Sequence, residues 1–132
     1  MPITALYAAL LAGLFILLSA RVIQHRRAQQ VEIGDGADRE LLRRMRVHAN
    51  FGEYTPLALI LMMLVESLSA SKPLLHVLGL ALCVGRSIHA YGLSQSPHNL
   101  RLRILGMVVT FTVIAVAAVT CLALALSRGI LF

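Results

Sequence analysis

The sequence predicts an all-α integral membrane protein, a bundle of four transmembrane helices. Hydrophobic residues make up 58% of the 132 residues, and the mean hydropathy of +0.81 is typical of membrane proteins rather than of soluble domains. A membrane-spanning helix needs roughly 20 mostly apolar residues. Four segments reach or approach that length: residues 3–20, 54–65, 73–93 and 104–127. We expect residues 1–132 to form a single domain.

The first helix is expected to run from about Thr4 to about Gln29, because residues 3–20 carry no charge. The segment Gly34-Asp35-Gly36 that follows predicts a turn. Asp38 is suited to cap the next helix, since an aspartate at that position accepts hydrogen bonds from the free N–H groups of the first turn.

The second helix is expected to continue from Asp38 to about Leu68, which is far longer than one membrane crossing. Its first half is rich in arginine. We therefore expect that half to project into the cytoplasm or to line a polar crevice, while residues 54–65 enter the membrane.

The third helix is expected to begin near Pro73, which lacks an N–H and therefore suits a first turn, and to end near Gly92. Its apolar sequence is interrupted by His76, Arg86 and His89. A membrane helix with such a polar stripe must turn it toward other helices or toward another subunit.

The fourth helix is expected to begin by about Asn99 and to end before Gly129, because residues 104–127 are uncharged. Cys83 and Cys121 lie in apolar stretches and have no metal-ligand partner at a useful spacing. We interpret both cysteines as small buried hydrophobic side chains and predict no metal site.

The formal net charge of +6 would suggest a nucleic-acid partner in a soluble protein, but in a membrane protein it indicates topology. Positive loops stay in the cytoplasm, so we place connections one and three there, both termini on the opposite side, and predict no nucleic-acid partner. The arginines concerned are Arg21, Arg26, Arg27, Arg39, Arg43, Arg44 and Arg46 for the first connection, and Arg101 and Arg103 for the third.

A polar cluster is predicted on the second helix, where Arg43, Arg46, Asn50 and Glu53 share one face at about 100° per residue. Charged groups in a bilayer are costly unless they are paired, so such residues are functional candidates. Because the run leads directly into Pro56 and the apolar segment after it, this face is carried to the edge of the membrane.

The cluster has more positive than negative charge. Arg86 and His89 are neighbours on the third helix, Arg103 lies at the start of the fourth, and Glu53 is the carboxylate that opposes them. The guanidinium fork suits carboxylates. These residues predict a small polyanionic ligand with an amine: arginines for its carboxylates, Glu53 for its ammonium and Asn50 for its amides.

Arg103 has a second possible role. A cation at a helix N-terminus opposes the helix dipole by about 0.3–1 kcal/mol, and a nearby thiolate would relieve this. Lowering a thiol pKa from about 8.5 to about 6.5 requires roughly 2.7 kcal/mol of differential stabilisation. The alternative is that Arg101 and Arg103 only contact lipid headgroups, and that His89 is an ordinary hydrogen-bonded helix histidine.

Three motifs resemble the MAPEG family, the membrane-associated proteins in eicosanoid and glutathione metabolism. The resemblance covers nearly the whole chain. The sequence is similar in particular to a small bacterial inner-membrane branch of the family, which shares the start Thr4-Ala5-Leu6-Tyr7 and the Gly34-Asp35-Gly36 connection. The motifs are Arg46-x-x-x-Asn50-x-x-Glu53-x-x-Pro56, Gly85-Arg86-x-x-His89-Ala90-Tyr91-Gly92 and Arg103-x-x-Gly106.

The resemblance implies a homotrimer of four-helix subunits in the bacterial inner membrane, with periplasmic termini and glutathione bound between subunits toward the cytoplasm. Arg103 would then be catalytic, stabilising the glutathione thiolate for attack on a hydrophobic electrophile from the bilayer. The expected glutathione-binding residues are Arg46, Asn50, Glu53, Arg86, His89 and Arg26, the last standing two residues after Gln24, where the related synthases carry an arginine.

Two positions depart from the eicosanoid synthases of that family. Ile104 stands where they have a serine after the helix 4 arginine, and Leu93 where they have a tyrosine one turn after the helix 3 histidine. Tyr91 cannot replace that tyrosine because it lies about 200° around the helix from His89. Proton-donor roles therefore do not carry over, and eicosanoid specificity is not predicted.

Three functions remain open. The first is a glutathione transferase or glutathione-dependent peroxidase acting on hydrophobic electrophiles, with Arg103 beside the glutathione pocket. The second is a non-catalytic lipid-binding adaptor of the same fold, which the loss of the serine and tyrosine equivalents favours. The third is a small transporter or channel subunit, which a single polar cluster on one side of the membrane argues against.

Overall fold

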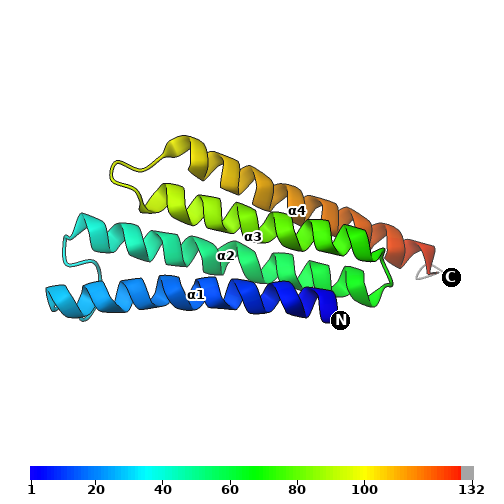
Figure 1. Cartoon of the computed structure of the whole chain (residues 1–132), viewed down its shortest axis with the longest axis horizontal. Helices are drawn as coiled ribbons and strands as arrows, with labels where there is room; N and C mark the ends of the chain where they lie inside the picture. The colour runs from blue at the N-terminus through cyan, green and yellow to red at the C-terminus, as the bar shows by residue number, and fades with distance from the viewer. Residues whose placement is uncertain (129–132) are drawn as a thin grey trace.

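Four long helices, joined by short connections, form an up-and-down bundle in the computed structural model, which describes residues 1–128. The helices are α1 (Pro2–Gln29), α2 (Arg39–Ser67), α3 (Lys72–Ser94) and α4 (Leu100–Ser127). Within these residues every pair of helices is in contact except α1 and α4. The start of α1 and the end of α4 lie at the same end of the bundle (Figure 1).

The helix ends agree with the expected capping residues. Asp38 accepts hydrogen bonds from the backbone N–H groups of Glu40 at 2.8 Å and Leu41 at 3.2 Å, as its N-cap position predicts. Pro73 lies in the first turn of α3, which continues to Ser94, two residues beyond the expected end. The prediction of four helices is therefore confirmed.

Three of the helices, α1, α3 and α4, are long and apolar enough to cross a membrane. Among the described residues α2 does not meet that standard, because its first half carries several charged side chains. This half is the part that the sequence places outside the membrane or along a polar crevice.

The core of the bundle lies between α2 and the other helices. It contains Leu11 and Leu18 of α1, Val47, Phe51, Ala58, Met62 and Val65 of α2, Leu75, Leu78 and Leu82 of α3, and Val113 and Ala117 of α4. Large apolar side chains such as Ile16, Leu80 and Leu122 instead point outward and are exposed. An apolar exterior of this kind suits contact with lipid tails.

Two glycines bring α3 and α4 unusually close. A Cβ at Gly106 would lie 2.6 Å from the Gly85 carbonyl oxygen and 2.6 Å from the His89 Cβ, which no real side chain tolerates. Small residues allow such close contact between membrane helices. The contact fixes His89 of α3 against the first turns of α4, where Arg103 lies.

Candidate functional site

Arg86 is the best buried of the predicted site residues, with none of its surface exposed. Its Nη2 donates to Asn50 Oδ1 at 2.6 Å and its Nη1 to the Met107 Sδ at 3.8 Å. The guanidinium also lies over the Phe51 ring, 5.5 Å from the ring centroid. Its Nε is buried and has no partner, and within residues 1–128 it forms no ion pair with a carboxylate.

His89 lies one turn from Arg86 and is only 3% exposed. Its Nδ1 is 3.0 Å from the backbone carbonyl oxygen of Arg103. Because that oxygen only accepts, Nδ1 carries the hydrogen, and the Nε2 of the neutral ring is left with a free lone pair. The Nε2 atom is buried and has no hydrogen-bond partner among the described residues, so its lone pair can accept a proton or a hydrogen bond.

Arg103 occupies the first turn of α4, and its Nε is also buried without a partner. Together with His89, Ile104 and Met107 it lines a cavity of about 220 Å³. The walls beyond Arg103 and His89 are apolar side chains of α4. The cavity is therefore lined by a cationic side chain, an imidazole ring and apolar side chains.

Arg46 and Glu53 lie on the outward face of α2, where both are exposed. Among the described residues neither forms an ion pair. Arg43 is already paired within α2, because its Nη1 donates to Glu40 at 2.9 Å. Of the predicted face, Asn50 thus meets Arg86 inside the subunit, while Arg46 and Glu53 remain open at its surface.

Arg26 is not brought to this cluster within one chain. It lies in the last turn of α1, where its guanidinium donates to the Glu32 carbonyl at 3.4 Å and to the Met45 Sδ at 3.3 Å. Its role in binding glutathione stays a prediction for a site formed between subunits.

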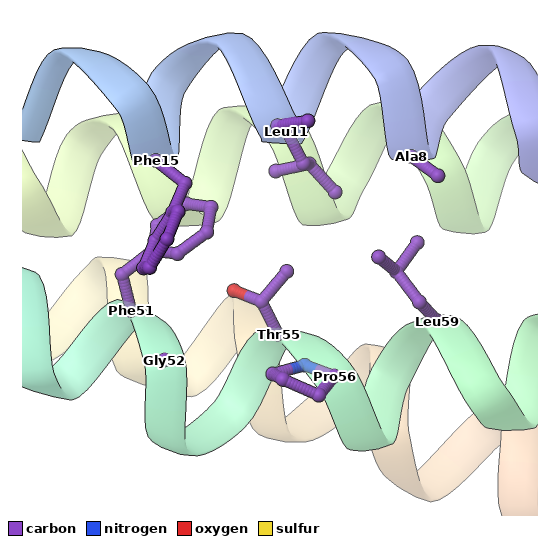
Figure 2. A pocket seen from close by; sticks show the side chains of 9 residues that line it. Ala8, Leu11, Phe15, Phe51, Gly52, Thr55, Pro56 and Leu59 are labelled. Carbon is purple, nitrogen blue, oxygen red and sulfur yellow. The ribbon is translucent and has the colours of Figure 1, made fainter. Parts of the chain in front are cut away.

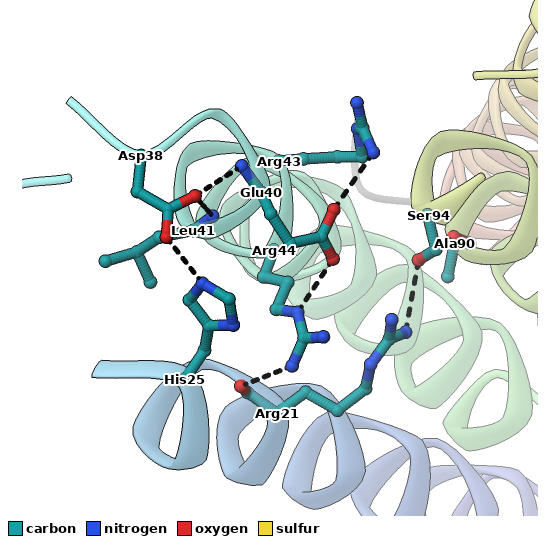
Figure 3. Close-up of polar contacts among 9 residues, drawn as sticks. All are labelled: Arg21, His25, Asp38, Glu40, Leu41, Arg43, Arg44, Ala90 and Ser94. Atoms are coloured by element: carbon teal, nitrogen blue, oxygen red, sulfur yellow. Dashed lines mark hydrogen bonds and ion pairs between the residues drawn. The ribbon is translucent and has the colours of Figure 1, made fainter. Parts of the chain in front are cut away.

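A second polar network ties α1 to α2 and α3 at the arginine-rich end of the bundle (Figure 3). The Nε2 of His25 lies 2.7 Å from Asp38 Oδ2, and this contact holds the pKa of the Asp38 carboxyl below its usual value, helped by the Leu41 and Glu40 N–H groups. Arg44 donates to Glu40 at 2.9 Å and to the Arg21 carbonyl at 3.2 Å. These residues are engaged with one another and serve to join helices.

Three site residues were not anticipated from the sequence: Phe51, Tyr54 and Met107. Phe51 and Met107 contact the Arg86 guanidinium, and Tyr54 packs edge-on against Phe111, with 5.3 Å between ring centroids. A signal for Tyr54 was present, because it stands four residues after Asn50 and so shares its helix face. The helical periodicity of the sequence does not show which aromatic ring or sulfur atom contacts a buried guanidinium.

A model of the MAPEG family matches residues 4–123. The chain belongs to the MAPEG family. It is also 39% identical to the Inner membrane protein YecN of Escherichia coli strain K12 over 90 residues, which cover 68% of this chain and 69% of that protein. YecN of Escherichia coli O6:H1 matches with the same identity and coverage. As a MAPEG protein with apolar helices, this is a membrane protein of the glutathione and eicosanoid metabolism family, which confirms the resemblance seen in the sequence.

Proposed function

We propose that this MAPEG protein is a glutathione-dependent transferase or peroxidase that activates glutathione for attack on hydrophobic electrophiles. One observation supports this most directly: the Nε of Arg86, the Nε2 of His89 and the Nε of Arg103 are all buried without a hydrogen-bond partner among residues 1–128. Buried polar atoms ordinarily have hydrogen-bond partners, and a buried polar atom without one costs free energy. Three such atoms on neighbouring turns of α3 and α4 indicate a ligand that forms the missing hydrogen bonds.

The charges of the site match glutathione. This tripeptide carries two carboxylates, one ammonium and a thiol. Arg86 and Arg46 supply cations for its carboxylates, and Glu53 supplies an anion for its ammonium. Asn50 already holds Arg86 in place at 2.6 Å, so the guanidinium is oriented before a ligand arrives.

The activation step needs a proton acceptor and a cation near the sulfur. His89 Nε2 offers a lone pair, and the Arg103 guanidinium lines the same cavity. The thiol proton passes to Nε2 and the sulfur anion is held by Arg103. In a transfer reaction the sulfur then bonds to the electrophilic carbon, while the electron pair of the broken bond leaves with the departing atom, which takes up a proton.

The outward position of Arg46 and Glu53 supports a site completed by another subunit. Both residues are exposed on α2 of the single chain, although charged groups at the membrane edge require partners. We place the site between the subunits of a homotrimer, toward the cytoplasmic side of a bacterial inner membrane, with the termini periplasmic. Arg26 then reaches the glutathione of the neighbouring subunit.

Ultraviolet difference absorbance tests this function. The detergent-purified protein is titrated with glutathione at neutral pH, alongside Arg103→Ala and the matched variant Arg101→Ala, whose side chain is exposed on the same turn. We expect a saturable thiolate band in the native protein and in Arg101→Ala, and none in Arg103→Ala. Calorimetric binding without the band in the native protein would refute activation, and absence of both would refute glutathione binding as well.

One observation favours a lipid-binding adaptor as the second candidate. Beside Arg103 and His89 stand Ile104, which is exposed, and Leu93, which packs against the core. Neither side chain can donate a proton to a product. An adaptor predicts lipid binding without glutathione binding, so the same titration, repeated with a labelled lipid, separates the two functions.

A further inference from the structure

A second cavity, of about 340 Å³, lies between α1 and α2 (Figure 2). Its walls are largely apolar, and its α1 side falls in the uncharged stretch of that helix. The exposed residues Gly52 and Pro56 lie at its rim, so the cavity opens to the surroundings of the bundle. Its volume is near the lower end of small-molecule sites, about 300–1,000 Å³, which suits one short chain rather than a whole phospholipid.

One polar side chain breaks the apolar wall. Thr55 is 3% exposed and projects into the space between the two helices (Figure 2), yet its hydroxyl oxygen has no hydrogen-bond partner in the part of the chain that the structure describes. Threonines inside helices usually donate to the carbonyl four residues earlier. Thr110, Thr112 and Thr120 of α4 do so, at 2.7, 2.8 and 2.8 Å. Thr55 differs from these threonines because its hydroxyl does not form this bond, and it lies at the wall of a cavity.

A backbone acceptor that lacks its usual helical donor stands beside Thr55. Pro56 has no N–H, so it cannot donate to the carbonyl of Gly52, four residues earlier in α2. Gly52 and Pro56 both line the cavity. The otherwise apolar cavity wall therefore includes one threonine whose hydroxyl has no partner among the described residues, and one residue whose carbonyl lacks its i+4 donor.

We propose that this cavity binds a single-chain lipophile that carries one hydroxyl group, with its apolar chain between α1 and α2. A hydroxyl donates to the Gly52 carbonyl and accepts from Thr55, whose side chain has two favoured χ1 rotamers in a helix and can turn toward a ligand. An alkane satisfies neither group and a ketone or ester only Thr55. An ionised carboxylate is costly at membrane depth.

This site is distinct from the proposed glutathione site. None of its lining residues belongs to the proposed glutathione site, which consists of Arg26, Arg46, Asn50, Glu53, Arg86, His89 and Arg103. Phe51 lies between the two, because its ring lines the cavity and also lies under the Arg86 guanidinium. Binding in the cavity is therefore measured without glutathione, and its outcome does not depend on the glutathione reaction.

Photolabelling in lipid nanodiscs tests the proposal. The full chain is labelled with a decanol that bears a mid-chain diazirine, and competition by n-decanol is compared with competition by n-decane at equal mole fraction in the membrane. We expect labelled peptides from residues 8–15 and 51–59. n-Decanol should displace the label at about tenfold lower mole fraction than n-decane, as one to two hydrogen bonds predict. Equal competition, or no label in these segments, overturns the site.

Two variants and a control sharpen the test. Thr55→Val keeps the shape and removes the hydroxyl, so the preference for n-decanol over n-decane should fall at least about threefold. Ala8→Leu fills the cavity and should abolish labelling. Thr112→Val replaces an exposed threonine whose hydroxyl already donates to the Val108 carbonyl. This control should leave both the labelling and the preference for n-decanol unchanged. An unaltered preference in a correctly folded Thr55→Val protein contradicts the proposal.

Discussion

The Nη2 of Arg86 lies 2.6 Å from the Oδ1 of Asn50, so an amide rather than a carboxylate holds the guanidinium buried in α3. An amide orients a cation without neutralising it. The positive charge of Arg86 therefore remains available to an anion from outside the chain, even though the side chain is fully buried. Five predictions follow from this contact and from others in the bundle.

Asn50→Leu should destabilise the protein by about 1.5–3 kcal/mol, because a hydrogen bond to a buried charged group is lost while the volume is kept. The double variant Asn50→Leu/Arg86→Met should recover most of that loss, since it removes the unpaired charge as well. Denaturation in mixed detergent measures both. Native stability in Asn50→Leu would show that the amide does not support Arg86.

His89→Asn should slow thiolate formation by about a hundredfold or more, because the amide can still donate to the Arg103 carbonyl but offers no basic lone pair. Stopped-flow absorbance after mixing with glutathione gives the rate. His48→Asn is the matched control, since His48 contacts Ser19 at 2.9 Å on the α1 side of α2, away from Arg103. Equal rates in the two variants would remove His89 from the proton transfer.

Glu53→Gln should weaken glutathione binding about tenfold, because the ammonium of glutathione loses its charged partner. A deaminated glutathione analogue provides the control, since it lacks that ammonium and should bind the native protein and the variant equally. Isothermal calorimetry measures the four affinities. A similar loss for both ligands would mean that Glu53 acts on the fold and not on the amine.

Asp38→Asn should reduce stability at neutral pH and flatten its acid dependence. The pKa of Asp38 is lowered in the folded chain by His25, so its stabilising effect is complete above the unfolded pKa. That effect disappears as the pH falls through the lower folded value. Thermal midpoints measured from neutral to acidic pH test this. Glu32→Gln, at an exposed carboxylate, should follow the native curve.

Glu66→Ala should loosen the start of α1. The two carboxylate oxygens of Glu66 accept hydrogen bonds from the N–H groups of Ile3 at 3.0 Å and Thr4 at 2.8 Å, so α2 caps another helix. We expect faster hydrogen exchange at these two amides in Glu66→Ala. The exchange rate in Glu66→Gln should lie between that of Glu66→Ala and that of the native protein. Unchanged exchange in Glu66→Ala would show that the cap contributes nothing.

The sequence predicted the four helices and their ends well, because charge-free stretches and residues such as Asp38 and Pro73 act locally. It also predicted that Arg86 and His89 share a face. It could not show that Asn50 turns inward to Arg86 while Glu53 stays outside, since helical periodicity places both on the same side of α2. Small differences in angle decide which residue meets α3, and these depend on the packing of the whole bundle.

The contacts to Arg86 beyond Asn50 were also out of reach of the sequence. Phe51 and Met107 lie on the helices before and after α3, and their contact with Arg86 depends on how the three helices pack. Aromatic and sulfur-containing side chains are also common in any apolar core. The pairing of Arg43 with Glu40 was closer to being predictable, because residues three apart on a helix are neighbours. It pairs one arginine of the predicted polar face with a carboxylate of the same helix.

The composition of α2 has a consequence for how the protein is made. Among the described helices it is the one that hydropathy does not assign to the bilayer, yet it contacts each of the other three. A newly synthesised α2 would partition weakly from the translocon into the bilayer, because its charge-free segment, residues 54–65, is shorter than the roughly 20 residues that span a membrane. Insertion of α2 into the bilayer then requires contact with α1 or with the later helix α3. Membrane insertion and helix packing are therefore coupled, and a chain that stops after α2 should be degraded rather than inserted.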